Sequence, residues 1–367
     1  MFRKEVKFYE LIAKDCPIRT PKAHYAKVAA GGQGTLVFED LSLLKDATFS
    51  NPWVADDELA TSVARCKNVI TQLAAMHAKY WNSPRFDNDL KYFATQGKGL
   101  AGGSGNITIM HHFFYNNGWP KYKENGLFDN SGNMGQLGDM LLEKFPQLYM
   151  LMYNNVSFDG ERLCLWREVA LVSSMQAYGT NLIRGFALSP PLSLRALLPS
   201  LLLLLFFSLS LSLSLSPTLF PRPHPQAAAP RTLVHGDTGV YNMMFYEGEK
   251  MCLFDWQFCQ AGNGIFDIAF FLSLSVGTKM LEDNEDEFLK LYHAELVKNG
   301  VKDYDEAQMR DDYKIGLATS WAIIVYVTSL LASKGPSWDE PIRIASQRTI
   351  KACERTGAVE HVLKLLA

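Results

Sequence analysis

The stretch that most constrains the fold of this chain is LVHGDTGVYNMMFYEGEKMCLFDWQ, residues 233–257. Two apolar runs, 242–246 and 251–255, flank a short polar link that contains Gly248. Glycine in a short polar link between two such runs is typical of a β-hairpin. The sequence therefore predicts a hairpin that follows directly on the segment LVHGD.

The predicted hairpin brings an amide and a carboxylate together. If its turn is centred on Gly248–Glu249, Asn242 and Asp255 face each other across the two strands. Directly opposed residues have Cβ atoms about 4.5–5.5 Å apart. Both side chains then lie beside Asp237, so we expect one oxygen-rich cluster at this end of the hairpin.

This cluster suits phosphoryl transfer. Magnesium prefers oxygen ligands, commonly one or two carboxylates together with phosphates and water, and the reaction needs a carboxylate that orients and deprotonates the attacking hydroxyl. The spacing from Asp237 to Asn242, with a later aspartate, matches the catalytic loop of protein kinases. The pattern predicts Asp237 as the base and Asn242 and Asp255 as metal ligands. The plainer alternative is that Asp237 caps a turn and Asn242 is a turn residue.

HGDTGVYN followed by LFDWQ resembles the aminoglycoside phosphotransferase and choline kinase superfamily, which carries HGDxxxxN and then a D-[WF] motif. The closer resemblance is to the ecdysteroid-kinase-like, or CHK kinase-like, proteins. It is carried in order by four further segments, FRKEVKFYE, LVFEDLS, LAAMHAKYW and GNGIFDIAFFL. The resemblance spans most of the chain outside residues 187–230.

This resemblance implies an α+β, bilobal, protein-kinase-like fold with a mainly helical C-terminal lobe. It implies ATP- and Mg²⁺-dependent phosphorylation of a hydroxyl on a small molecule, with Asp237 as the catalytic base and Asn242 and Asp255 as Mg²⁺ ligands. The acceptor itself and the oligomeric state are left open.

The resemblance also implies a nucleotide-binding set. Glu39, Asp40 and Leu41 would offer backbone groups to adenine, and Glu5 would be the helix glutamate that pairs with a phosphate-binding lysine. Asp267 would brace the catalytic loop.

The chain departs from the family pattern at its start. The family's Gly-rich loop and lysine strand precede the helix of Glu5, and this sequence begins at that helix, so we expect a truncated N-terminal lobe. GKGLAG at 97–102 matches GxGxxG but lacks a strand–turn–helix context, so we do not expect it to bind nucleotide. The alternative function is therefore a catalytically inactive pseudokinase or binding module.

The resemblance, together with the low-complexity composition of residues 187–230, implies four regions. They are a remnant of the N-terminal lobe and hinge at 1–46, the first part of the helical lobe at 47–186, a low-complexity insertion at 187–230, and the catalytic loop, metal-binding hairpin and C-terminal helices at 231–367.

The insertion alternates serine and leucine after a run of leucines. Residues 197–215 are long enough to cross a membrane, but Pro199 and the serines weaken that interpretation. A retained intron is the favoured explanation and a disordered surface loop the second.

Charge, cysteine spacing and the N-terminus argue against a nucleic-acid-binding, zinc-binding or secreted protein. The formal net charge is −2 and no basic block occurs, so no nucleic-acid partner is expected. The six cysteines show no CxxC or zinc-type spacing, which favours reduced thiols in a cytoplasmic protein. The charged N-terminus lacks the apolar core of a signal peptide, and no membrane association is expected.

Three histidines are expected to be structural. His235 is predicted to be packed and hydrogen-bonded rather than a base, and His111–His112 a loop pair rather than a metal site. The aromatic stretch 111–122 is predicted either to line an acceptor pocket or to belong to the core.

Overall fold

The computed structural model describes six ranges of the chain: residues 2–29, 34–50, 62–94, 115–152, 230–331 and 339–367. The chain divides into two compact units, residues 1–156 with 226–367, and residues 157–225. The second unit lies wholly outside the described residues, so the description below concerns the first.

The N-terminal part is a helix packed on a two-stranded sheet. Helix α1 (Phe2–Leu11) buries an apolar face that includes Val6 and Phe8. Strands β1 (Ala23–Val28) and β2 (Gly34–Phe38) pair antiparallel, and α1 contacts both.

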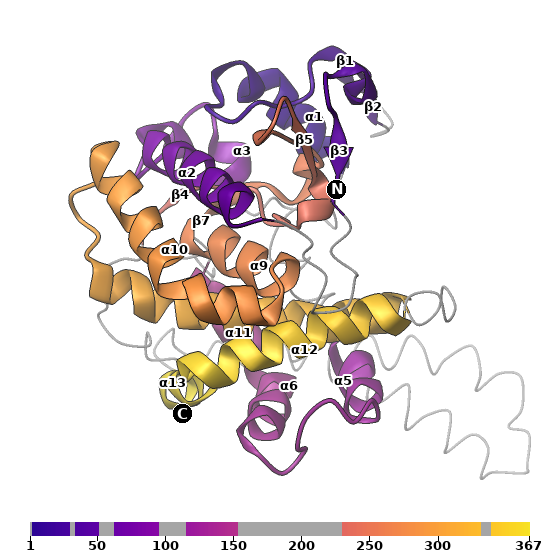
Figure 1. Cartoon of the computed structure of the whole chain (residues 1–367), viewed down its shortest axis with the longest axis vertical. Helices are drawn as coiled ribbons and strands as arrows, with labels where there is room; N and C mark the ends of the chain where they lie inside the picture. The colour runs from indigo at the N-terminus through magenta and orange to yellow at the C-terminus, as the bar shows by residue number, and fades with distance from the viewer. Residues whose placement is uncertain (1, 30–33, 51–61, 95–114, 153–229, 332–338) are drawn as a thin grey trace, which may run out of the picture. The chain divides into compact units, whose positions relative to one another are not determined.

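Two further small sheets are formed by the predicted hairpin with β3 and by the strands on either side of the hairpin. Strand β5 (Met243–Tyr246) lies between β3 (Thr48–Phe49) and β6 (Lys250–Leu253), antiparallel to both. Strand β4 (Thr232–Val234) pairs antiparallel with β7 (Gln260–Gly262). The chain therefore enters the hairpin from β4 and leaves it into β7, so that both ends of the segment are tied together (Figure 1).

The rest of the described chain is helical. The helices are α2 (Val63–Lys79), α3 (Lys91–Ala94), α5 (Asn116–Lys123), α6 (Asn133–Met152), α9 (Ile265–Ser275), α10 (Thr278–Lys298), α11 (Glu306–Leu331), α12 (Asp339–Thr356) and α13 (Ala358–Leu366). Helix α9 is buried along its whole length, because α11, α12 and α2 pack around it (Figure 1). Its central position makes it a rigid support for the loop after β4.

The helix boundaries follow local signals. Ser62 caps α2 by accepting a hydrogen bond from the backbone N–H of Arg65, 3.1 Å away. Helix α10 ends at Lys298, and Gly300 just beyond it has a φ of 99° that favours glycine.

The aromatic stretch at 111–122 supplies core side chains. Tyr115, Trp119 and Tyr122 are buried, and Trp119 makes an edge-to-face contact with Trp321 of α11, with ring centroids 5.6 Å apart. For these three residues the core interpretation is therefore confirmed. His111–His112 lies outside the described residues.

The described residues form the α+β arrangement that the sequence predicted, mainly helical with small antiparallel sheets. Among the helices that the structure describes, none is both long and apolar enough to cross a bilayer. The leucine-rich residues 197–215 and GKGLAG at 97–102 fall outside the described ranges.

Candidate active site

The loop after β4 positions Asp237. Gly236, just before it, has a φ of 84°, and a Cβ there would lie 2.8 Å from the carbonyl oxygen of Phe258. Both the backbone conformation and the space therefore require glycine. The HGD sequence is a sharp turn that leaves Asp237 half-buried at the end of the strand.

Asp267, in the first turn of α9, braces this turn. Its two carboxylate oxygens accept hydrogen bonds from the backbone N–H groups of His235 and Gly236, at 2.7 and 2.9 Å. Its backbone carbonyl accepts a hydrogen bond from the hydroxyl of Thr238, at 2.7 Å. Asp267 is fully buried. The bracing role predicted for it is confirmed by these bonds.

His235 is a structural residue, as predicted. It is fully buried, its Nδ1 accepts the backbone N–H of Asp237 at 3.2 Å, and its Nε2 lies 2.9 Å from the carbonyl oxygen of Phe254. Because a backbone N–H donates to one nitrogen and a carbonyl accepts from the other, the ring is the neutral Nε2–H tautomer. His235 thus ties the turn to the end of the hairpin.

Asp237 and Asn242 are joined across a 3₁₀ helix, Val240–Asn242. The side-chain amide of Asn242 donates to the backbone carbonyl of Asp237 at 2.9 Å, which leaves the amide oxygen for another partner. The carboxylate Oδ1 of Asp237 accepts a hydrogen bond from the hydroxyl of Tyr241 at 2.6 Å. Burial raises the pKa of Asp237, the Tyr241 bond opposes the rise, and the charge of Asp255 adds to it.

The predicted register of the hairpin is wrong by one residue. Met243 faces Leu253 and Tyr246 faces Lys250, so Asn242 and Asp255 are not directly opposed. The reason is the turn, which has three residues rather than two, with Glu247 at a φ of 43° and Gly248 at 83°.

Asp255 still reaches the same region by another route. Beyond β6, the backbone carbonyl of Asn242 accepts the N–H of Phe254 at 3.1 Å, and Asp255 then adopts a left-handed conformation with φ 61° and ψ 60°. This conformation turns the chain out of the strand. The Asp255 charge acts on both Asp237 and Glu5, so the three carboxylates share one region.

Glu5 of α1 comes to this group from the far end of the sequence. It is 8% exposed, and its carboxylate accepts a hydrogen bond from the backbone N–H of Trp256. Burial first, and the charge of Asp255 second, raise the pKa of Glu5 to about 7. The rings of Phe8 and Trp256 stack with centroids 3.8 Å apart, which holds α1 against the loop that carries Asp255.

This donor set fits a magnesium ion. Asp255 offers a carboxylate and Asn242 an amide oxygen, and the Asp255 charge acts on both Asp237 and Glu5. Within the described ranges, no cluster of three or more His, Cys, Asp or Glu side chains is arranged to hold a metal. Phosphate oxygens and water would therefore have to complete the coordination sphere.

The three residues expected at the hinge lie between β2 and β3. The carboxylate of Glu39 binds Nη2 of Arg19 through both oxygens, each at 3.1 Å. Asp40 caps a short 3₁₀ helix that starts at Leu41, by accepting the N–H and hydroxyl of Ser42 at 2.9 and 2.6 Å. The side chains of Glu39 and Asp40 are thus already hydrogen-bonded within the protein. Any contact of this segment with adenine would therefore have to be made by its backbone.

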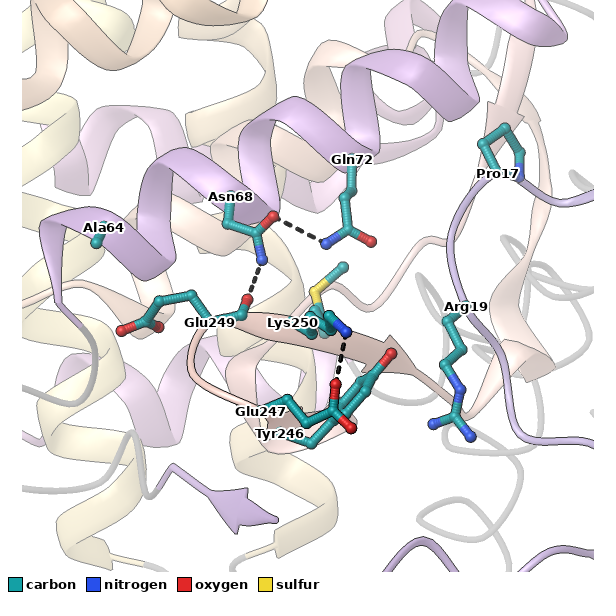
Figure 2. Close-up of a pocket in the computed structure, with 10 residues that line it drawn as sticks. Pro17, Arg19, Ala64, Asn68, Gln72, Tyr246, Glu247, Glu249 and Lys250 are labelled. Carbon is teal, nitrogen blue, oxygen red and sulfur yellow. Dashed lines mark hydrogen bonds and ion pairs between the residues drawn. The ribbon is translucent and has the colours of Figure 1, made fainter. Parts of the chain in front are cut away.

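A separate hollow of about 540 Å³ lies between α2 and the turn of the β5–β6 hairpin (Figure 2). Asn68 donates to the backbone carbonyl of Glu249, and Lys250 pairs with Glu247 at its rim. The lining does not include Asp237 or Asp255, so this hollow is distinct from the candidate active site.

Sequence reasoning missed the contact of Tyr241 with Asp237. The signal was the i, i+4 spacing across a short turn, together with Gly239 between the two residues. It also missed the link from His77 of α2 to Asp267, since this connects residues far apart in the chain.

Residues 218–303 match the Ecdysteroid kinase-like family. This segment contains the whole candidate catalytic loop and hairpin. The resemblance to ecdysteroid-kinase-like proteins that the motifs indicated is therefore confirmed. The α+β, kinase-like fold predicted with it is the fold of that family. A comparison with curated proteins found no match.

Proposed function

We propose that this ecdysteroid kinase-like protein transfers the γ-phosphate of ATP, with Mg²⁺, to a hydroxyl group of a small molecule. The observation that carries the proposal is the half-buried Asp237 carboxylate, presented by a turn whose backbone is held by Asp267 and His235. Such a rigid support suits a group that must meet a hydroxyl in one geometry.

The proposed mechanism assigns one task to each residue. Asp237 orients the acceptor hydroxyl and takes its proton as the oxygen attacks phosphorus in line. Asp255 and the amide oxygen of Asn242 would hold magnesium, which when bound neutralises charge on the phosphates. Asn242 also fixes the backbone of Asp237 through its 2.9 Å bond.

The nucleotide would lie along the segment that joins β2 to β3. Glu39, Asp40 and Leu41 would contact adenine through the backbone, because two of their side chains already serve local structure. This segment reaches the hairpin directly, since Phe49 pairs with Met244. Glu5 would face the phosphate region beside Asp255. A cytoplasmic setting fits the use of ATP.

The test is a phosphotransfer screen with Mg·ATP and a panel of small hydroxyl compounds that begins with ecdysteroids, as the family name suggests. Products are detected as phosphate esters by mass spectrometry. Asp237→Asn keeps the shape of the side chain and removes the base, so turnover should fall by about 10²–10⁴-fold. Product formation that is equal in the two proteins would refute the assignment of Asp237.

The second candidate is a binding module without turnover. It is favoured by one observation: within the described ranges Glu5 forms no ion pair with a lysine, and its carboxylate is bound by the N–H of Trp256 instead. Calorimetry with Mg·ATP separates the two functions. A protein that binds small hydroxyl compounds but shows neither Mg·ATP binding nor phosphotransfer would support the module.

A further inference from the structure

The hydroxyl of Tyr241 lies where an acceptor hydroxyl has to bind. It donates to Oδ1 of Asp237 at 2.6 Å. A general base must lie about 2.6–3.2 Å from the oxygen whose proton it takes. An acceptor would present an O–H donor to Asp237. Tyr241 already places such a donor on one of the two carboxylate oxygens.

The loop has room for this contact because residue 239 is glycine. The backbone of Gly239 has φ −63° and ψ 145°, a conformation that any residue adopts, so conformation alone does not require glycine there. A Cβ at this position would lie 2.2 Å from ring atoms Cε1 and Cζ of Tyr241. The missing side chain thus provides the space in which the ring lies against Asp237.

The backbone on both sides of Tyr241 is anchored. The N–H of Val240 donates to the hydroxyl of Ser275 at 2.9 Å, and the N–H of Asn242 donates to the carbonyl of Gly239 at 2.9 Å. The Tyr241 side chain is only half-buried. Rotation of this side chain would free Asp237 without breaking any of these backbone bonds.

We infer that Tyr241 is an internal stand-in for the acceptor, whose hydroxyl holds Asp237 until an acceptor hydroxyl displaces it. The inference rests on the proposed function, since it assumes that Asp237 is the base. Its consequence is selectivity against water. Without an acceptor, Oδ1 of the base is occupied by the phenol of Tyr241 rather than by water, and hydrolysis of ATP is suppressed.

The first experiment measures access to Asp237 and needs no nucleotide. The full chain is treated with a water-soluble carbodiimide and glycine ethyl ester, and labelling of Asp237 is read by peptide mass spectrometry. The exposed Asp283 serves as the internal reference for reagent dose. We expect Tyr241→Phe, which keeps the ring and removes the hydroxyl, to raise labelling of Asp237 several-fold.

Gly239→Ala is the second variant, because its methyl group would displace the ring while Tyr241 stays in the sequence. It should raise labelling as well, and melting curves verify that both variants are folded. Labelling of Asp237 that is unchanged in a folded Tyr241→Phe protein overturns the inference, because the hydroxyl would then not guard the carboxylate.

The second experiment measures Mg·ATP hydrolysis to water without added acceptor. Tyr241→Phe should hydrolyse ATP several-fold faster than the wild type, and Asp237→Asn in the same background should remove the gain. Faster labelling without faster hydrolysis, in a protein that binds Mg·ATP by calorimetry, overturns the stand-in role. If no variant binds Mg·ATP, the proposed function fails, the stand-in role falls with it, and the labelling result then reports only whether the phenol shields Asp237.

Discussion

His77 and Asp267 meet in the interior of the protein, with Nε2 of His77 3.2 Å from Oδ2 of Asp267 and neither side chain exposed. The other ring nitrogen of His77 lies 2.9 Å from the hydroxyl of Tyr292 in α10. Asp267 in turn holds the N–H groups of His235 and Gly236. Helices α2, α9 and α10 thus support the candidate catalytic turn from behind through one buried polar network (Figure 1).

Asp267→Ala should destabilise the protein by about 3 kcal/mol or more, because it leaves His77 and two backbone N–H groups buried without their acceptor. Urea unfolding followed by circular dichroism measures the change. Asp283→Ala is the matched control, since it removes an exposed aspartate that pairs with Lys279 and should cost about 0.5 kcal/mol or less. Similar stability losses in the two variants would contradict the network.

Asp312 should make stability depend on pH. It is 4% exposed, accepts hydrogen bonds from Asn263 at 2.7 Å and Tyr304 at 2.9 Å, and burial raises its pKa to about 6. Since the folded pKa lies above the unfolded value, the folded state binds the proton more tightly. The resulting stability is fully present below about pH 4 and is lost as pH rises through 6.

Asp312→Asn is the test of this dependence. The amide cannot titrate, so between pH 4 and pH 7 the wild type should lose up to about 3 kcal/mol of unfolding free energy relative to the variant. The measurement is urea denaturation of both proteins at several pH values in that window. Parallel stability curves for the two proteins would show that Asp312 does not titrate there.

Asp255→Ala should abolish Mg²⁺-dependent turnover, because it deletes the one carboxylate assigned to the metal. Asn242→Ala should weaken both metal binding and the hold on Asp237, since its amide also bonds the Asp237 backbone. Gln257→Ala is the control, as its amide lies 3.2 Å from Oδ2 of Asp255 but is not itself a proposed ligand. A metal dependence that survives Asp255→Ala would exclude the assignment.

Replacement of residues 187–229 by a short flexible linker should leave the fold intact. Strand β4, which leads into the candidate active site, is anchored just past this segment: the N–H of Asn82 donates to the Arg231 carbonyl at 2.7 Å, and the N–H of Arg231 donates to the side-chain oxygen of Asn82 at 3.0 Å. The Arg231 guanidinium also forms a bidentate pair with the Asp87 carboxylate, with Nη1 3.1 Å from Oδ1 and Nη2 2.9 Å from Oδ2.

The linker variant should therefore melt at or above the temperature of the full chain and give more soluble protein, because it lacks a leucine-rich segment. Thermal melting and soluble yield of the two proteins are compared side by side. Loss of cooperative unfolding in the variant would show that the segment is a structural element.

Much of the fold was readable from the sequence because its signals are local. Glycine between two apolar runs predicted the β5–β6 hairpin. The HGD turn and the later aspartate identified the residues Asp237, Asn242 and Asp255. These features depend on neighbours within a few positions, where backbone preferences act directly.

The register of the hairpin was not readable, since two-residue and three-residue turns both fit EGEK. The turn has three residues, Glu247–Glu249, with positive φ angles at Glu247 and Gly248, and its length shifts every pair by one residue. Asp255 rejoins the site only through its own left-handed backbone conformation. The sequence predicted that these residues lie in one region, but it did not predict the path that brings them together.

Contacts between distant segments were decided by tertiary packing alone. Stacking of Phe8 on Trp256 sets Glu5 of the first helix beside Asp255, and burial there raises the Glu5 pKa to about 7. The link from His77 to Asp267 likewise requires α2 and α9 to be packed. Sequence by itself determined which chemical groups the protein has and how each short segment turns. The burial and charge that set their behaviour arise only when separate segments exclude water from one another.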